Sequence, residues 1–115
     1  MSYDIFLYEK QFLRRALEED LGDWTNADPI PDDKLRLIRE RLKSKGYATD
    51  DDNEFEFPNA DWGLEVSVFK GEVAFGIAYW DNADAAIEKA RADALELAQD
   101  TELGFYDPQT DEAIT

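Results

Sequence analysis

Alternating apolar residues predict a β-hairpin in the second half of the chain. Every second position from Leu64 to Val68 and from Val73 to Ile77 is apolar, and Lys70-Gly71 provides a two-residue turn in which glycine can adopt a positive φ. This turn places Val68 opposite Val73, Val66 opposite Phe75 and Leu64 opposite Ile77. We therefore expect these side chains to share one buried face of the hairpin.

The opposite face of the second hairpin strand carries small residues beside a tryptophan. Ala74, Gly76, Ala78 and Trp80 alternate with the apolar residues of the buried face. Small side chains either let a helix pack closely against a sheet or leave a shallow groove. Because the segment that follows is rich in alanine, we expect it to form a helix that packs on this small-residue face.

Apolar residues three and four positions apart predict three helices, over residues 10–21, 31–46 and 83–100. Proline opens the second helix, and glycines end the first two. The expected buried stripes are Phe12, Leu13, Ala16, Leu17 and Leu21; Leu35, Ile38 and Leu42; and Ala83, Ala86, Ile87, Ala90, Ala94, Leu97 and Ala98. On the solvent face of the third helix we expect the ion pairs Glu88–Arg91 and Lys89–Asp93.

Aromatic and β-branched residues predict three further strands, at residues 3–8, 54–57 and 103–107. The order of elements is then β-α-α-β-β-β-α-β. This order predicts a single α+β domain over residues 1–115, in which three helices pack on a mostly antiparallel sheet of about four to five strands.

The chain is strongly acidic, with 28 Asp and Glu against 12 Lys and Arg and a formal net charge of −16. This balance argues against binding nucleic acid or an anionic membrane, because contacts with phosphate need Lys and Arg. It favours attraction to a basic protein partner, although acidity also serves solubility alone. The sequence has no cysteine, no apolar run of transmembrane length and no recognisable signal peptide, so we expect a cytoplasmic protein.

The basic residues are concentrated in the second predicted helix. The segment from Lys34 to Lys45 holds six of the twelve Lys and Arg and a single acid, Glu40. Bases near the C-terminal end of a helix stabilise it, so a solvated helix face explains this pattern. The alternative is a basic surface that docks on the acidic surface of a second copy and forms a homodimer.

A run of carboxylates, TDDDNEFEF, covers residues 49–57. An EF-hand calcium loop that starts at Asp50 would have Phe55 where glycine makes the sharp turn and Asp61 where glutamate is needed. We therefore expect no metal site in this run. It is instead typical of a solvated acidic loop suited to electrostatic recognition.

The absence of histidine and cysteine excludes the catalytic triads and the usual zinc sites that depend on them. The glycines are scattered and form no phosphate-binding loop. In so acidic a chain, carboxylates at a suitable spacing do not by themselves identify a general acid and base. We expect no catalytic residues, no cofactor and no enzymatic activity.

Both ends of the chain carry short motifs, MSYDIFLY at residues 1–8 and ALELAQDTELGFYDPQTDEAI at residues 94–114. They resemble a group of small bacterial proteins that begin with Met-Ser-Tyr-Asp and an apolar strand. Those proteins end with an amphipathic helix, a glycine, two aromatic residues and Asp, often followed by Pro-Gln. Similar endings occur in immunity proteins of bacterial polymorphic-toxin systems. The resemblance implies two neighbouring terminal strands with a structural role and supplies no catalytic residues.

These observations favour a non-enzymatic binding protein that resembles an immunity protein and neutralises a basic partner such as a toxin nuclease. The expected contact site is the acidic loop of Asp50, Asp51, Asp52 and Glu54, with Trp62 as an aromatic anchor. Trp62 would otherwise cover the core. Two other functions stay open: self-association through the basic helix, and binding or carboxylate catalysis on a small ligand at the hairpin face around Gly76 and Trp80.

Overall fold

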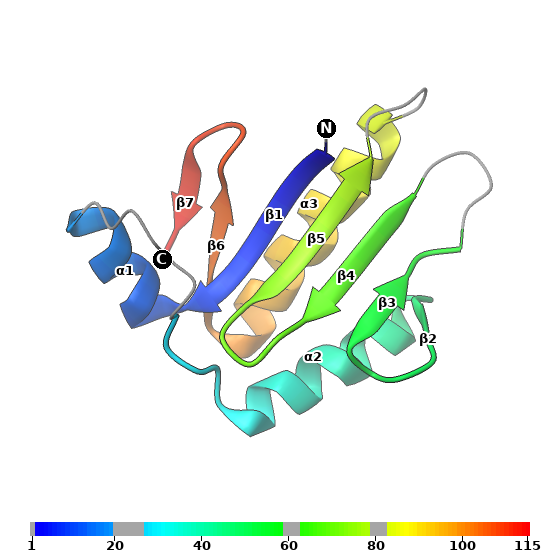
Figure 1. Ribbon diagram of the computed structural model, residues 1–115, viewed down its shortest axis with the longest axis horizontal. Helices are drawn as coiled ribbons and strands as arrows, with labels where there is room; N and C mark the ends of the chain where they lie inside the picture. The colour runs from blue at the N-terminus through cyan, green and yellow to red at the C-terminus, as the bar shows by residue number, and fades with distance from the viewer. Residues whose placement is uncertain (1, 20–26, 59–62, 79–82) are drawn as a thin grey trace.

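The computed structural model describes residues 2–19, 27–58, 63–78 and 83–115. Within these residues three helices pack on one antiparallel sheet of seven strands (Figure 1). The helices are α1 (Lys10–Glu18), α2 (Asp32–Ser44) and α3 (Ala83–Thr101). The strands are β1 (Ser2–Glu9), β2 (Ala48–Thr49), β3 (Glu54–Glu56), β4 (Leu64–Val68), β5 (Val73–Ala78), β6 (Leu103–Asp107) and β7 (Glu112–Ile114).

The strands lie in the order β2-β3-β4-β5-β1-β6-β7, so β1 occupies the interior of the sheet between β5 and β6. The expected hairpin is confirmed in its register, with Val68 opposite Val73, Val66 opposite Phe75 and Leu64 opposite Ile77. The expected strand number was too low. The additional strands β2 and β7 have two and three residues, too few to produce a recognisable alternation in sequence.

One face of the sheet is covered by α2 and α3, and Figure 1 shows α3 running behind β1 and β5. The main core there includes Ile5, Leu7, Leu35, Ile38, Leu42, Val66, Phe75, Ile77, Ala86, Ala90, Ala94, Leu97 and Phe105. The expectation that the alanine-rich helix packs on the small-residue face of β5 is therefore wrong. The alanines of α3 pack against the large side chains of the opposite face, because small helix residues leave room for large sheet residues.

On the other face of the sheet, α1 is the one described helix that packs, and it does so on a second cluster formed by Tyr8, Phe12, Leu13 and Ala16. The helix approaches Gly104 of β6 so closely that a Cβ atom there would lie 2.6 Å from Leu13 Cδ2. Leu17, which we expected to be buried, is 41% exposed because α1 ends one residue later and contacts the sheet only with its first turns. Leu21 lies outside the described residues.

At two positions, 46 and 71, the structure shows why the residue is glycine. Gly46 ends α2 with a φ of 96°, as the sequence indicated. Gly71 in the β4–β5 turn does not adopt a positive φ, contrary to our expectation, but a Cβ atom there would lie 2.9 Å from the carbonyl oxygen of Ala27. Glycine is needed at this turn because the segment that leads into α2 crosses over it.

Helices α2 and α3 have nearly the bounds that the sequence predicted, and most of the predicted apolar stripes are buried. Of the two ion pairs expected on α3, Lys89 and Asp93 do pair, at 3.0 Å, but Asp93 is buried rather than solvated. Arg91 contacts residues of β6 and β7 instead of Glu88. Across the described ranges, none of the helices has the length and apolar character required to span a membrane.

Candidate functional site

The acidic loop connects β2 to β3 and is organised by its own side chains. Asp51 Oδ1 accepts hydrogen bonds from the backbone N–H groups of Asn53 and Glu54, at 2.9 and 3.0 Å. These bonds stabilise the ionised carboxylate and lower the pKa of Asp51. Thr49 closes the turn, because its hydroxyl donates to the carbonyl oxygen of Glu54 and accepts from the backbone N–H of Asp52.

The basic helix α2 holds this loop from one side. Lys43 Nζ lies 2.7 Å from Asp52 Oδ1, and Arg39 Nε donates to the carbonyl oxygen of Asp52 at 2.9 Å. Asp52 itself has a φ of 63°, a conformation that needs support from its surroundings. Asp51 and Asp52 therefore have a structural role in the loop, whereas Asp50 is exposed and forms no contact of this kind with the described residues.

Two further cations, Arg41 of α2 and Lys45 just after it, contact carboxylates of α3. Lys45 Nζ lies 2.7 Å from a carboxylate oxygen of Glu96, and Arg41 lies 3.8 Å from Asp100. Three of the six cations from Lys34 to Lys45, namely Arg41, Lys43 and Lys45, thus form ion pairs within one molecule. This internal pairing weakens the electrostatic reason for a homodimer through this helix, which stays a prediction.

Carboxylates gather on a part of the sheet that none of the three described helices covers. Glu54 and Glu56 of β3 and Glu65 of β4 are exposed on the face opposite the main core. Together with Asp50 they line a shallow hollow of about 270 Å³ at the β2–β3–β4 corner. We call these four residues, Asp50, Glu54, Glu56 and Glu65, the acidic face.

The strand register sets two of these carboxylates directly against each other. Glu56 and Glu65 are cross-strand partners, and no Lys or Arg among the described residues forms an ion pair with either of them. All twelve Lys and Arg of the chain lie in the described ranges. Glu54 differs because it accepts a hydrogen bond of 2.7 Å from the Ser67 hydroxyl. Like charges directly opposite each other destabilise a sheet, so the fold gains nothing from this pair.

Two expected site residues lie outside the described residues, namely Trp62 and Trp80. The rest of the small-residue hairpin face, at Ala74 and Gly76, is half-buried and has no helix packed on it. Sequence reasoning identified Asp50 and Glu54 but missed Glu56 and Glu65. The alternation of β4 places Glu65 on the solvent face, but only the pairing of β3 with β4 brings Glu56 beside it.

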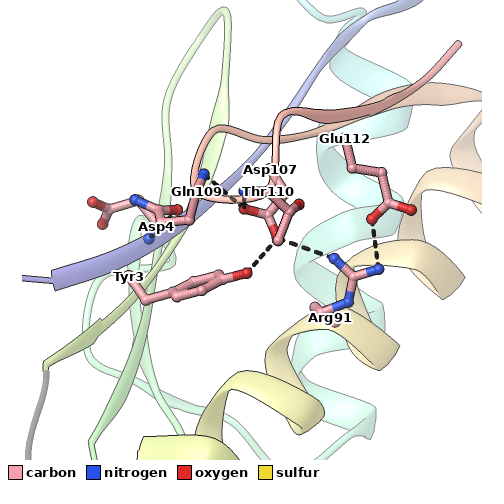
Figure 2. Close-up of polar contacts among 7 residues, drawn as sticks. All are labelled: Tyr3, Asp4, Arg91, Asp107, Gln109, Thr110 and Glu112. Carbon is pink, nitrogen blue, oxygen red and sulfur yellow. Dashed lines mark hydrogen bonds and ion pairs between the residues drawn. The ribbon is translucent and has the colours of Figure 1, made fainter.

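The two terminal motifs meet where β1, β6 and β7 lie side by side, at the end of the sheet opposite the acidic face (Figure 2). Tyr3 Oη donates a 2.6 Å hydrogen bond to Asp107 Oδ2, and the backbone N–H of Asp4 donates to Gln109 Oε1 at 3.3 Å. Strands β1 and β6 are paired, as the resemblance of the two ends implied. Burial and the bond to Asp107 raise the pKa of Tyr3 to about 12, so the phenol stays protonated as a donor.

Asp107 is fully buried and surrounded by donors. Arg91 of α3 reaches it through Nη1 at 3.0 Å and reaches Glu112 through Nη2 at 2.6 Å. The other carboxylate oxygen of Asp107 accepts from the backbone N–H groups of Gln109 and Thr110, which shapes the turn into β7. Both carboxylate oxygens of Asp107 accept hydrogen bonds, so this cluster stabilises the β6–β7 hairpin.

A second buried carboxylate is bound in a similar way on the same side of the sheet as α2. Asp93 accepts a 2.7 Å hydrogen bond from Tyr47 Oη, and Lys89 Nζ lies 3.0 Å from it. The Lys89 ammonium also lies 4.2 Å from the centre of the Phe57 ring. Burial and the neighbouring Asp93 raise the pKa of Tyr47.

The described residues contain no cluster of Asp and Glu arranged to hold a metal ion, and each of their buried side-chain nitrogen and oxygen atoms has a hydrogen-bond partner. The described carboxylates thus differ in their surroundings: Asp93 and Asp107 are buried and bound by donors, whereas most of the acidic face is exposed and has no such donor. Comparison of this chain with models of protein families and with curated proteins found no match.

Proposed function

We propose that this protein is a non-enzymatic binding protein for a basic partner protein, and that the acidic face is its contact surface. The observation that carries the proposal is the unmatched cross-strand pair of Glu56 and Glu65. The two carboxylates face each other on an open surface, and no Lys or Arg of the described residues offsets their repulsion. Cations of a partner would relieve the repulsion on binding, so the pair favours association over folding.

The acidic loop belongs to the same surface. Asp50 lies beside Glu54 and Glu56 in the shallow hollow, while Asp51 and Asp52 fix the shape of the loop. A rigid loop loses little conformational entropy on binding. In this proposal Trp62 follows β3 closely in the sequence and is retained as the aromatic anchor of the contact.

The resemblance of the two termini to immunity proteins supports one form of this function, the neutralisation of a basic toxin by occlusion of its surface. Steering by the field of an acidic molecule would raise the association rate by about 10 to 1000-fold at low salt, and the gain would fall as salt increases. Such an inhibitor needs no catalytic group of its own.

The experiment compares two double variants with the same change in net charge. Glu56→Gln/Glu65→Gln neutralises the acidic face, and Glu18→Gln/Glu19→Gln neutralises two exposed carboxylates at the end of α1. Each protein serves as bait in a lysate of the source cells at low salt, with elution by a salt gradient. We expect the unaltered protein and the α1 variant to retain the same basic protein and the acidic-face variant to lose it.

Association rates of the purified partner then provide the quantitative check. The acidic-face variant should associate at least about tenfold more slowly, with a weaker dependence on salt. If both double variants slow association equally, net charge alone is responsible, and the acidic face is not the contact surface.

A further inference from the structure

Among the strands that the structure describes, β7 forms one edge of the sheet and pairs with β6 alone. Exposed edges are usually protected by lysine, proline, a bulge or a covering segment. The described residues provide none of these at Ala113 and Ile114, which are both exposed. Glu112 is the one charged residue of β7. Its Oε1 lies 2.6 Å from Arg91 Nη2, so its charge is directed at α3 and does not protect the edge from pairing.

An apolar groove runs beside this edge, between α3 and the end of the sheet. Its volume is about 450 Å³, within the range of sites that take a ligand. Its apolar walls are formed by Ala92, Leu95 and Ala98 of α3 and by Leu103, Phe105 and Ile114 of the sheet. We call this the β7 groove. Ile114 is 48% exposed at its rim and is one of the few large apolar side chains left open to solvent among the described residues.

We propose that the β7 groove and the β7 edge together form a second binding surface, which takes an extended segment of a partner protein as an eighth strand. The edge offers unpaired main-chain groups to such a segment, and the groove offers an apolar wall to its side chains. In a strand every second side chain points to the same face, so alternate apolar residues of the segment would lie against Ile114 and Leu95.

The charge of the molecule indicates the chemistry of the segment. At a net charge of −16 the chain attracts cations, and Lys10 is the only base that lines the groove, with Glu96 among the other lining residues. Residues of the segment that point away from the groove are therefore expected to be Lys or Arg. The same net charge opposes the approach of a second copy through this edge, since two such molecules repel each other.

This surface is independent of the acidic face. The acidic face lies at the β2–β3–β4 end of the sheet on the open side, and the β7 groove lies at the opposite end on the side covered by α3 (Figure 1). The two surfaces can therefore be tested separately, and either can fail without the other.

The probes are three synthetic seven-residue peptides with blocked ends. The first has the sequence Lys-Val-Lys-Ile-Lys-Val-Lys, the second replaces every Lys by Glu, and the third is the first peptide with alternate backbone nitrogens methylated. Binding is followed by NMR of the isotope-labelled full chain. We expect the first peptide to shift the amide signals of Ala113 and Ile114 and to slow their hydrogen exchange, and we expect the other two to bind more weakly.

Variants then locate the binding. Ile114→Lys guards the edge and removes the rim of the groove, and it should weaken the first peptide by about tenfold or more, as the loss of an apolar contact in a pocket does. Leu17→Lys makes the same change at a similarly exposed leucine on α1 and should leave the affinity unchanged. Glu56→Gln/Glu65→Gln should also leave it unchanged.

Three results would overturn the proposal. The first is equal binding of the methylated peptide, which would rule out strand pairing. The second is loss of binding in the acidic-face variant but not in Ile114→Lys. The third is dimerisation of the unaltered chain that Ile114→Lys abolishes, since the occupant of the edge would then be a second copy.

Discussion

Asp107 and the pair Glu56–Glu65 show two opposite environments for the same chemical group. Asp107 is completely buried and accepts from a phenol, a guanidinium and two backbone N–H groups. Glu56 and Glu65 are exposed, face each other across two strands and have no cation beside them among the described residues. The difference shows that the carboxylates behind the net charge of −16 have different roles. Some stabilise the fold, and others are exposed to solvent, where a partner can contact them.

The largest expected effect comes from removing the buried carboxylate. Asp107→Ala leaves Arg91 with Glu112 as its remaining carboxylate partner and removes the acceptor of the Tyr3 hydroxyl and of two turn amides, so it should lower the free energy of unfolding by about 3–5 kcal/mol. Urea denaturation measures the change. The control Asp50→Ala removes an exposed carboxylate and should change stability by no more than about 0.5 kcal/mol. Equal effects of the two substitutions would remove the distinction.

A smaller effect is expected from the phenol that joins the two ends of the chain. Tyr3→Phe deletes the hydrogen bond to a buried carboxylate and should cost about 1.5–3 kcal/mol. The loss also has a pH signature. The folded pKa of Tyr3 is about 12 against an ordinary value of 10.0, so its contribution is complete below pH 10 and is lost as the pH rises toward 12.

Denaturation curves between pH 8 and 12 should therefore converge for the unaltered protein and Tyr3→Phe. Tyr8 and Tyr47 also have raised pKa values and are present in both proteins, so their effects cancel in the comparison. Curves that stay parallel over the whole range would contradict the role given to the Tyr3 hydroxyl.

The opposite sign is expected on the acidic face. Glu56→Lys replaces a repulsive cross-strand pair by an attractive one and should raise the free energy of unfolding by about 0.2–1 kcal/mol. The same substitution should weaken capture of the basic partner. Thermal and urea denaturation test the first effect, with Glu18→Lys as the charge-matched control. A loss of stability in Glu56→Lys would mean that the two carboxylates do not repel each other in the folded protein.

The smallest effect belongs to an intermediate case, Glu72, which is partly buried and accepts a long hydrogen bond of 3.4 Å from Tyr8 Oη. Burial raises its pKa, so its protonated form favours the folded state. This contribution is present below the ordinary pKa of 4.5 and is lost as the pH rises through the folded value. Glu72→Gln should flatten the dependence of stability on pH just above 4.5, as measured by denaturation at a series of pH values.

The elements that the sequence predicted well are those with a regular repeat of side chains. The hairpin register followed from alternation on both sides of Lys70-Gly71, and the ends of α2 followed from Pro31 and Gly46. The strands β2 and β7 did not follow, because main-chain pairing of two or three residues leaves no pattern. The prediction of the sheet face on which α3 packs was wrong. Small residues occur both on α3 and on one face of β5, and a small-residue surface packs best against a surface of large residues.

The acidic face could be predicted only in part. Asp50 and Glu54 stand out as members of a run of carboxylates, but Glu56 and Glu65 become neighbours through the register of β3 against β4. Likewise Arg91 has Glu88 within one helical turn, and the fold directs it to Asp107 and Glu112 instead. Tertiary partners of this kind are set by how strands pair, and local spacing does not contain that information.

The interior position of β1 has a consequence for the synthesis of the protein. Tyr3 and Asp107 lie 104 positions apart in sequence, and β1 needs β5 and β6 on its two sides. At ribosomal speeds, Asp107 is added roughly 5–20 s after Tyr3. Because β5 is added before β6, the edge of β1 that pairs with β6 is the last to gain its partner. Until β6 has been added, this edge of an aromatic, apolar strand is open to pairing with a wrong strand.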